Sequence, residues 1–518
     1  MDHIAPIDWI ICVSYVAAIV GVGLFVSRKQ QTNDDYFFAG RKMHWLPVGL
    51  SLFAASLSSN SFVGMPAEGA FGNYHQLLAI LFVPFVIVPI MCLWFVPFYR
   101  SFGFISLYEY LERRFSRPIR LVASAIFVVY LAGWIGTMLL AVTRILSVVL
   151  ETDATSHVIA IIVVVGLLST LYTAIGGAKA VIWTDAIQAF VLFGGMIVLL
   201  FLVVGKIDGS WTTFFQDGAR AGKFDMFRTD GLLAERNLFS ACAFGFFVYL
   251  GAHVASYGTY QRFVSVPSVK DVRQSMYIKG VFTLFSCTLY FLVGTALFVF
   301  YQQSQVEVFN ELSSGKAKDQ LMPHFVVHHA GLVGLTGAIL AGLFAASMSS
   351  MDTGINSMTA SIVTDWFEGR ELGMRFNRVL TFGLGIFATG VACLLSMIDT
   401  PVFDLLLSLI GATLGLLTAV FLLGMLVPRA NTAGAIAAVV VGLSVFAVIR
   451  LWIPSLEGEE LRRVGVFAGL KNNSWWDAMF TTVPAFTAGV LASYLRPAPP
   501  EERTRGLLLF RRRDWLNP

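Results

Sequence analysis

The sequence predicts an all-α polytopic membrane protein with about 13 transmembrane helices, arranged as a five-plus-five inverted repeat with two discontinuous helices. The first observation is composition: of 518 residues, 57% are hydrophobic and only 13% are charged, and the mean hydropathy is +0.73. No soluble domain of this size has such a composition. The second is a series of apolar segments long enough to cross a bilayer. The third is that two of these segments contain a polar break.

The apolar segments follow one another along the chain with mostly short polar loops between them. The first has neither the short apolar core nor the cleavage site of a signal peptide, and acidic Asp2 and Asp8 stand at its start, so we expect it to remain as a membrane helix. The segments lie near residues 7 to 28, 44 to 69, 75 to 98, 119 to 150, 156 to 176, 181 to 205, 238 to 262, 276 to 302, 327 to 364, 377 to 397, 402 to 427, 431 to 453 and 475 to 495.

The distribution of basic residues predicts an amino terminus outside and a carboxyl terminus in the cytoplasm of a cell (inner) membrane. When loops are assigned alternately to the two sides, those that fall inside carry more Lys and Arg, among them Arg41, Arg113 and Arg114. The tail after Arg496 is also basic and is expected to be a membrane anchor. This asymmetry and attraction to anionic lipid explain the net charge of +4, so no nucleic-acid partner is indicated.

The two polar breaks predict the repeat. Segment two contains a run of small polar residues from Ser56 to Ser61, and segment seven reads FGFFVYLGAHVASYGTYQRF. Interrupted helices at equivalent places in two five-helix repeats mark the binding site of inverted-repeat transporters. The alternative is that the glycines only let helices pack closely. The predicted division is a first helix and inner loop at 1–42, a first repeat at 43–205, an outer loop at 206–237 that could hold a short amphipathic helix, a second repeat at 238–427, two added helices at 428–495 and a basic tail at 496–518.

The ninth segment contains the sequence AASMSSMDT, which predicts a cation site. Ala346, Ser349, Ser350 and Thr353 stand at i, i+3, i+4 and i+7, so they share one face of a helix. Hard cations prefer oxygen ligands, and two hydroxyls plus carbonyls from a broken neighbouring helix would make a five-ligand Na+ site. The alternative is that each serine bonds back to a carbonyl of its own helix and does nothing else.

Two carboxylates lie deep in predicted membrane segments. Asp185 lies in VIWTDAIQAF near the start of segment six, and Asp352 lies near the middle of segment nine. A buried acid in a membrane must pair, bind a cation or stay protonated. Asp185 could instead be a charge at the amino-terminal end of a helix. A proton-coupled transporter that uses both acids is therefore an alternative to a sodium-coupled one.

An enzyme is not indicated. No nucleophile with a histidine and an acid partner stands out, and there is no metal-ligand pattern such as HExxH. The five cysteines fall in apolar segments without a CxxC pair, so neither disulfides nor a soft-metal site is expected.

Several stretches resemble the sodium:solute symporter family in the order that the family has them. The match covers about residues 7 to 450 and includes DDYFFAGRKMHWLPVGLSLFAASLSSNSFVGMPAEG, FVPFYRSFGFISLYEYLERRF, TAIGGAKAVIWTDAIQAFVLFGG, YQRF, AASMSSMDTGINSMTASIVTD and VFLLGMLVPRANTAGAIAAVVVG. The resemblance implies the same five-plus-five fold and Na+ as the coupling ion.

The resemblance also implies the ion ligands. The sodium site would use the carbonyls of Ala54, Leu57 and Ala346 and the hydroxyls of Ser349 and Ser350. A second cation site, found in some members, would consist of Asp185, Ser349, Asp352 and Thr353. The family usually has Ser or Thr where Asp352 stands, so this chain departs from the pattern. The extra carboxylate could strengthen that site, convert it to a proton site or abolish it, so one or two Na+ ions are expected.

The resemblance implies a substrate pocket between segments two, four, seven and eleven. Sugar carriers of the family have a Gln where Ser61 stands and sialic-acid carriers an arginine where Trp134 stands, so this chain supports neither substrate. It looks closer to the branch that carries monocarboxylates, vitamins and inorganic anions. His253 could bind substrate or be a satisfied interior histidine. The expected pocket residues are Ser56, Ser59, Asn60, Ser61, Tyr249 and His253.

These observations together predict a sodium-coupled symporter that imports a small polar solute, such as a monocarboxylate, by alternating access. Its partners would be the lipid bilayer and the small-molecule substrate, and it would work as a monomer. A transporter-like membrane sensor is a further alternative, but the 22-residue tail after Arg496 is too short for a signalling domain.

Overall fold

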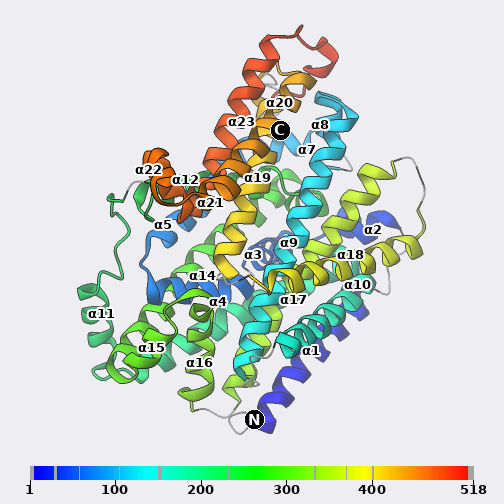
Figure 1. The fold of residues 1–518 in the computed structure, drawn as a ribbon. Coiled ribbons are helices and arrows are strands. Elements are labelled where there is room, and N and C mark those ends of the chain that lie inside the picture. The colour runs from blue at the N-terminus through cyan, green and yellow to red at the C-terminus, as the bar shows by residue number, and fades with distance from the viewer. Residues whose placement is uncertain are drawn as a thin grey trace.

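The computed structural model describes residues 5–27, 32–57, 59–103, 106–149, 155–231, 233–331, 334–368, 370, 372–398 and 402–510, and every regular element in these ranges is a helix (Figure 1). The predicted all-α membrane fold is therefore confirmed. Nine helices of this described part are long and apolar enough to span a membrane, or up to eleven if each of two bent pairs is one span. The number of 13 spans stays a prediction.

The helices begin with α1 (Pro6–Ser27), and the second membrane segment is divided into α3 (Trp45–Ala54) and α4 (Ser59–Phe71). The third runs from α5 (His75–Phe82) through the π-helical turns η2 (Val83–Ile87) and η3 (Met91–Phe95), with α6 (Val88–Ile90) between them, to α7 (Val96–Arg100). Pro84, Pro89 and Pro97 lie in this stretch. Because proline has no N–H, the regular helical ladder is interrupted there, which favours the wider turns.

The rest of the bundle consists of long helices. Within α10, Gly177 has φ 59° and ψ 176°, a conformation that only glycine adopts readily, and the helix is divided there between two predicted segments. The bounds are α9 (Arg117–Val149), α10 (Thr155–Gly205), α12 (Leu238–Val254), α13 (Tyr257–Ser265), α14 (Val269–Ser304), α17 (Leu335–Trp366), α18 (Met374–Leu395), α19 (Val402–Leu426), α20 (Thr432–Ala447) and α23 (Asp477–Tyr494).

The two predicted discontinuous helices are present. The chain bends by 57° between α3 and α4 and by 56° between α12 and α13. Side chains satisfy the helix ends at both breaks: the Ser56 hydroxyl donates to the Leu52 carbonyl, and the Ser256 hydroxyl accepts from the Thr259 amide. Because a helix end leaves more backbone groups without an intrahelical partner than one side chain can satisfy, each break also places polar backbone groups in the interior, which is tolerated in a membrane protein only where they are buried in protein or line a cavity.

Helix α14 packs against both halves of the first broken helix. A Cβ atom on Gly49 of α3 would lie 2.8 Å from the Ser275 carbonyl oxygen, and one on Gly69 of α4 would lie 2.8 Å from the Phe291 carbonyl oxygen. At Gly294 of α14 the added atom would lie only 2.2 Å from the Pro66 carbonyl oxygen. The backbones of α14 and the broken helix are thus in direct contact, as small residues allow in membrane bundles.

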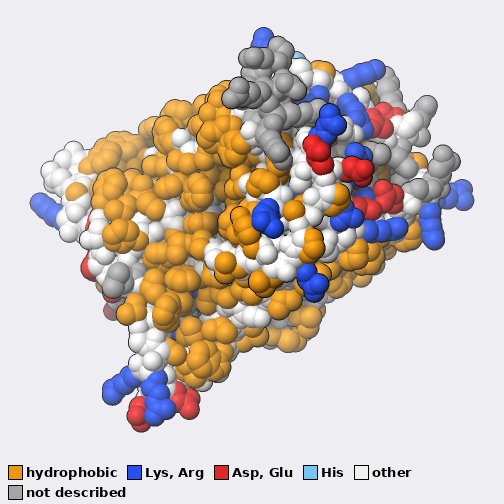
Figure 2. Space-filling view, turned by 90° about the horizontal axis from the view of Figure 1, so that it is seen from above, with side chains coloured by type: hydrophobic (Ala, Val, Ile, Leu, Met, Phe, Trp, Pro, Cys, Tyr) orange, Lys and Arg blue, Asp and Glu red, His pale blue; other side chains and the backbone are white. Residues whose placement is uncertain are grey.

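The surface of the bundle is largely apolar. Figure 2 shows hydrophobic side chains over much of one face, with Lys, Arg, Asp and Glu gathered at its ends. Large exposed side chains such as Phe85, Leu168 and Phe201 belong to this surface. In a bilayer they would contact acyl chains.

Short helices cover the ends of the bundle. α11 (Ser210–Arg220), α15 (Val306–Glu311) and α16 (Leu321–His328) lie at one end, and α8 (Glu109–Arg114) lies at the opposite end with the described part of the tail (Figure 1). α11 falls in the loop where a short amphipathic helix was expected. Among the basic residues on which the membrane orientation rests, Arg28, Lys29 and Arg511 to Arg513 lie outside the described ranges.

The tail packs against the bundle. Leu507 and Leu509 are buried, the Leu509 amide donates to the Met425 carbonyl at the end of α19, and the Tyr110 hydroxyl of α8 donates to the Leu507 carbonyl. The tail was expected only as a basic anchor. Its apolar residues give it a second role, which is to join α8 to α19.

Candidate ion and substrate site

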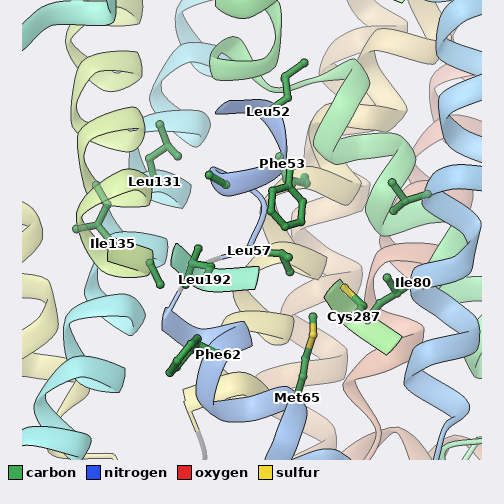
Figure 3. Close-up of a cluster of buried hydrophobic side chains, with 14 of the residues drawn as sticks. Leu52, Phe53, Leu57, Phe62, Met65, Ile80, Leu131, Ile135, Leu192 and Cys287 are labelled. Carbon is green, nitrogen blue, oxygen red and sulfur yellow. The ribbon is translucent and has the colours of Figure 1, made fainter. Parts of the chain in front are cut away.

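A cavity of about 150 Å³ lies between the two broken helices and α9, α14, α17 and α19. One wall is apolar: in Figure 3, Leu57 lies in the break between α3 and α4, and Met65 of α4 lies beside Ile80 and Cys287. Trp134 and Leu131 of α9 also line the cavity. The polar and charged lining residues are Ser56, Ser61, Tyr130, Tyr249, His253, Ser256, Thr259, Arg262, Lys279, Thr283, Thr353 and Ser357.

Four of the six predicted substrate residues line this cavity, namely Ser56, Ser61, Tyr249 and His253. The other two face a neighbouring helix. The Ser59 hydroxyl donates to the Met138 carbonyl at 3.0 Å, and the Asn60 amide donates to the Thr137 hydroxyl at 2.8 Å. Ser59 and Asn60 therefore fasten the start of α4 to α9 and are not among the lining residues. This orientation depends on tertiary packing, so the sequence held no signal for it.

The predicted sodium ligands lie on helices that contact each other. Ala54 ends α3, Leu57 lies in the break, and α17, which carries the other three, packs against both α3 and α4. Ala346, Ser349 and Ser350 are completely buried. All five residues are thus in the interior, on elements that pack against each other.

Ser349 and Ser350 differ in their hydrogen bonding. The Ser349 hydroxyl donates to the Ala346 carbonyl at 3.2 Å. This is the bond to a carbonyl of its own helix that was the alternative to an ion-binding role. The Ser350 hydroxyl has no hydrogen-bond partner among the described residues, although it is buried. An unpartnered buried hydroxyl destabilises a protein by about 1–3 kcal/mol, so a ligand or water is expected there. An oxygen in that position suits a bound Na+.

At Asp185 the structure reveals an arginine that sequence reasoning missed. Arg262 of α13 donates through Nη2 to Asp185 at 3.0 Å and to the Thr353 hydroxyl at 2.6 Å. Asp185 also accepts from the Ser51 hydroxyl at 2.6 Å, and its side chain is fully buried. The guanidinium thus lies between two of the predicted ligands of the second cation site and supplies the positive charge that the carboxylate needs.

Asp352 has a different neighbour. Its carboxylate accepts a short hydrogen bond from the Thr173 hydroxyl of α10, and its side chain is completely buried. Of the four residues predicted for a second cation site, the structure brings Asp185 and Thr353 to the same guanidinium. The site itself stays a prediction.

A second missed residue is Lys279 of α14, which lines the cavity and is almost fully buried. Its ammonium lies 2.7 Å from Nε2 of His253, and Nδ1 of His253 lies 2.6 Å from the Tyr249 carbonyl oxygen. The available signal was a single basic residue close to the predicted start of segment eight.

Ion pairs and a lysine secure the end of the bundle that carries α11. Glu68 of α4 pairs with Arg236 at 2.7 Å, and Arg144 of α9 pairs with Asp319. The Lys223 ammonium donates to the carbonyls of Ala70, in the last turn of α4, and of Gly72, which follows it, and burial lowers the pKa of Lys223 to about 8. Because helix carboxyl ends attract cations, Lys223 stabilises this end of the broken helix.

Comparison with known proteins places this architecture among transporters. Residues 36–442 match the family model described as "Sodium:solute symporter family". A sodium/sialic acid symporter of Proteus mirabilis is 29% identical over 446 residues, which are 84% of this chain and 88% of that protein. The human sodium-coupled monocarboxylate transporter 1 is 29% identical over 460 residues, 86% of this chain and 73% of that protein.

A solved structure shares the overall fold. It is a Na+-coupled sialic acid symporter in a substrate-bound outward-open state, 26% identical in sequence, with a TM-score of 0.81. The alignment covers 95% of this chain and 99% of that one. The five-plus-five arrangement with two broken helices is thus shared with a solved transporter.

Proposed function

We propose that this chain, which belongs to the sodium:solute symporter family, imports a small organic anion such as a monocarboxylate together with Na+ by alternating access. It is a Na+-coupled solute symporter of that family. The observation that carries the proposed ion site is the buried Ser350 hydroxyl, which has no hydrogen-bond partner among the described residues and belongs to α17, a helix that packs against both halves of the broken helix α3–α4. Na+ held there would bridge the two five-helix repeats.

Coupling requires that Na+ bind one conformation better than the other. A Na+ held by carbonyls at Ala54 and Leu57 on one side, and by Ser349 and Ser350 on the other, fixes the distance between α17 and the break. Any rocking of one repeat against the other would separate these ligands. Na+ therefore favours the conformation in which they meet. If that conformation also binds the solute, Na+ raises the affinity for solute by the same factor by which the solute raises the affinity for Na+.

The choice of an organic anion rests on the cavity and the relatives. Two relatives carry carboxylates, sialic acid and monocarboxylates. The cavity of about 150 Å³ suits a small molecule, and Trp134 lines it where sialic-acid carriers are expected to have an arginine. These features favour a compact carboxylate over a sialic acid.

The ion site is tested with Ser350→Ala in proteoliposomes. The half-saturating Na+ concentration for uptake should rise by at least about tenfold, because losing one ligand oxygen weakens Na+ binding. Ser347→Ala is the matched control, since that buried serine lies on the same helix and contacts the Met351 sulfur. A Ser350→Ala protein with the parental Na+ dependence would remove this site from consideration.

The same vesicles separate the alternatives. Uptake that persists without Na+ and collapses with an uncoupler would select proton coupling through Asp185 and Asp352.

The charge moved per cycle gives the stoichiometry: one Na+ with a monoanion is electroneutral, whereas two Na+ carry one net charge and make uptake sensitive to the membrane potential. Asp185→Asn should lower the Na+ Hill coefficient if a second ion binds there. We also propose that the transporter works as a monomer.

A further inference from the structure

We propose that the ammonium of Lys279, held in place by His253, is the group that binds the carboxylate of the transported solute. This inference rests on the proposed function, because it assigns the anion-binding group of the same cavity. Lys279 comes from α14 and His253 from the last turn of α12, so the pair joins two helices that line the cavity. Both side chains are almost fully buried.

The hydrogen bonds fix how protons are shared in this pair. A carbonyl oxygen only accepts, so Nδ1 of His253, 2.6 Å from the Tyr249 carbonyl oxygen, must carry a hydrogen. Nε2 of a neutral ring then offers a lone pair to the Lys279 ammonium at 2.7 Å. If both groups were protonated, two donors would meet at that distance. The pair therefore carries no more than one positive charge, and the ring orients the Lys279 amino group.

Two of the three ammonium hydrogens remain for a ligand. Lys279 forms one hydrogen bond, to His253, among the residues that the structure describes, and no described carboxylate pairs with it. The other cation of the lining, Arg262, is paired with Asp185. When Lys279 is protonated, the lining thus has one positive charge that no protein acid in the described ranges balances.

A buried charge without a counter-charge is unfavourable in a low-dielectric interior, so a bound anion would stabilise this arrangement. A carboxylate can accept both remaining ammonium hydrogens. Apolar lining residues such as Met65, Ile80 and Leu131 would contact the rest of the molecule. The structure therefore favours a monocarboxylate with a compact apolar substituent over a sugar, a dianion or a cation.

The experiment compares acids with their amides. Thermal stabilisation of the purified full chain in saturating Na+ is measured with propionate, lactate, pyruvate and benzoate, and with the corresponding amides. At least one acid should stabilise the protein and its amide should not, because the amide has the same shape but no charge. If no acid stabilises it, or if an amide matches its acid, the inference is wrong.

Variants of Lys279 test whether this residue is the one that binds the acid. Lys279→Gln should raise the half-saturating acid concentration by at least about tenfold, whereas Lys279→Arg, which keeps a cation, should retain the preference for acid over amide. Lys270→Gln is the matched control, because it removes an exposed charge from the same helix. Equal acid affinity in the parent and in Lys279→Gln would overturn the inference.

Stabilisation by Na+ alone keeps this inference separate from the proposed function. A folded Lys279→Gln protein should still be stabilised by Na+, because its ion site is intact. If Na+ stabilises the parent and no carboxylate does, the ion site survives and the anion-binding role of Lys279 fails. If Na+ itself has no effect, the proposed ion site fails. Should Lys279→Gln not fold, the acid and amide comparison on the parent still decides.

Discussion

Replacing Arg262 by glutamine tests how the buried carboxylate of Asp185 is neutralised. In the structure the guanidinium donates to Asp185 at 3.0 Å, to the Ser51 hydroxyl at 2.8 Å and to the Thr353 hydroxyl at 2.6 Å. Arg262→Gln keeps some hydrogen-bonding capacity but removes the positive charge. Asp185, whose side chain is completely buried, would then have no cationic partner among the described residues.

The expected loss of stability is large. Breaking a buried ion pair by removing one partner typically destabilises a protein by about 3–5 kcal/mol. Arg262→Gln combined with Asp185→Asn removes both charges, so its effect should be smaller than the sum of the single effects by about 1–3 kcal/mol. Melting in detergent of the parent, the two single variants and the double variant measures this coupling. Additive effects would mean that the pair has no energetic role.

The stabilisation of each variant by Na+ is the second measurement. Without the guanidinium, Na+ is the available cation for Asp185, so Arg262→Gln should be stabilised by Na+ more strongly and with a steeper concentration dependence than the parent. Arg450→Gln is the matched control, because Arg450 pairs with buried Asp477 at 2.6 Å outside the two repeats. If both variants respond to Na+ as the parent does, Arg262 is purely structural and the reasoning is refuted.

Two further predictions concern stability. Gly294→Ala should lower the melting temperature, because its Cβ would lie 2.2 Å from the Pro66 carbonyl oxygen and overpacking of this kind costs about 1–3 kcal/mol. Gly390→Ala is the control and should have little effect, because its Cβ would meet nothing within 4 Å. Equal melting temperatures of the two variants would contradict the close contact at Gly294. In α16, burial and the neighbouring His328 lower the pKa of His324 from 6.5 to about 4. The unfolded chain therefore binds the proton more readily, and stability is present above about pH 6.5 and lost as the pH falls toward 4. His324→Gln should reduce the slope of melting temperature against pH in this window, and an unaltered slope would show that His324 does not contribute to it.

The broken helices could be predicted from the sequence because they leave a local signal. A run of small polar residues from Ser56 to Ser61 is out of place in a membrane segment, and the glycines around Tyr249 mark the second break. The fold follows from these breaks and their spacing, since an odd number of helices per repeat permits only one relative orientation. The family comparison confirms this part of the reasoning.

The cations of the cavity could not be predicted because hydropathy assigns a charged residue to the edge of a membrane segment. Arg262 ends the predicted seventh segment, and Lys279 lies close to the predicted start of the eighth. In the structure the 56° bend leads α13 back into the interior, and α14 begins at Val269, about two turns earlier than the apolar pattern indicated. Both charges are therefore buried. Only the path of the backbone reveals this.

Helix α14 packs across the break in the first broken helix. Gly49 contacts it on one side of the break and Gly69 on the other, in both cases with backbone against backbone. Because backbone packs directly against backbone, the helices cannot easily slide past each other. We therefore expect the two half-helices and α14 to move together as one rigid unit. Lys279 lies one turn from Ser275, the residue that Gly49 meets. Whatever repositions the ion ligands of the break must therefore carry the ammonium of Lys279 along with them.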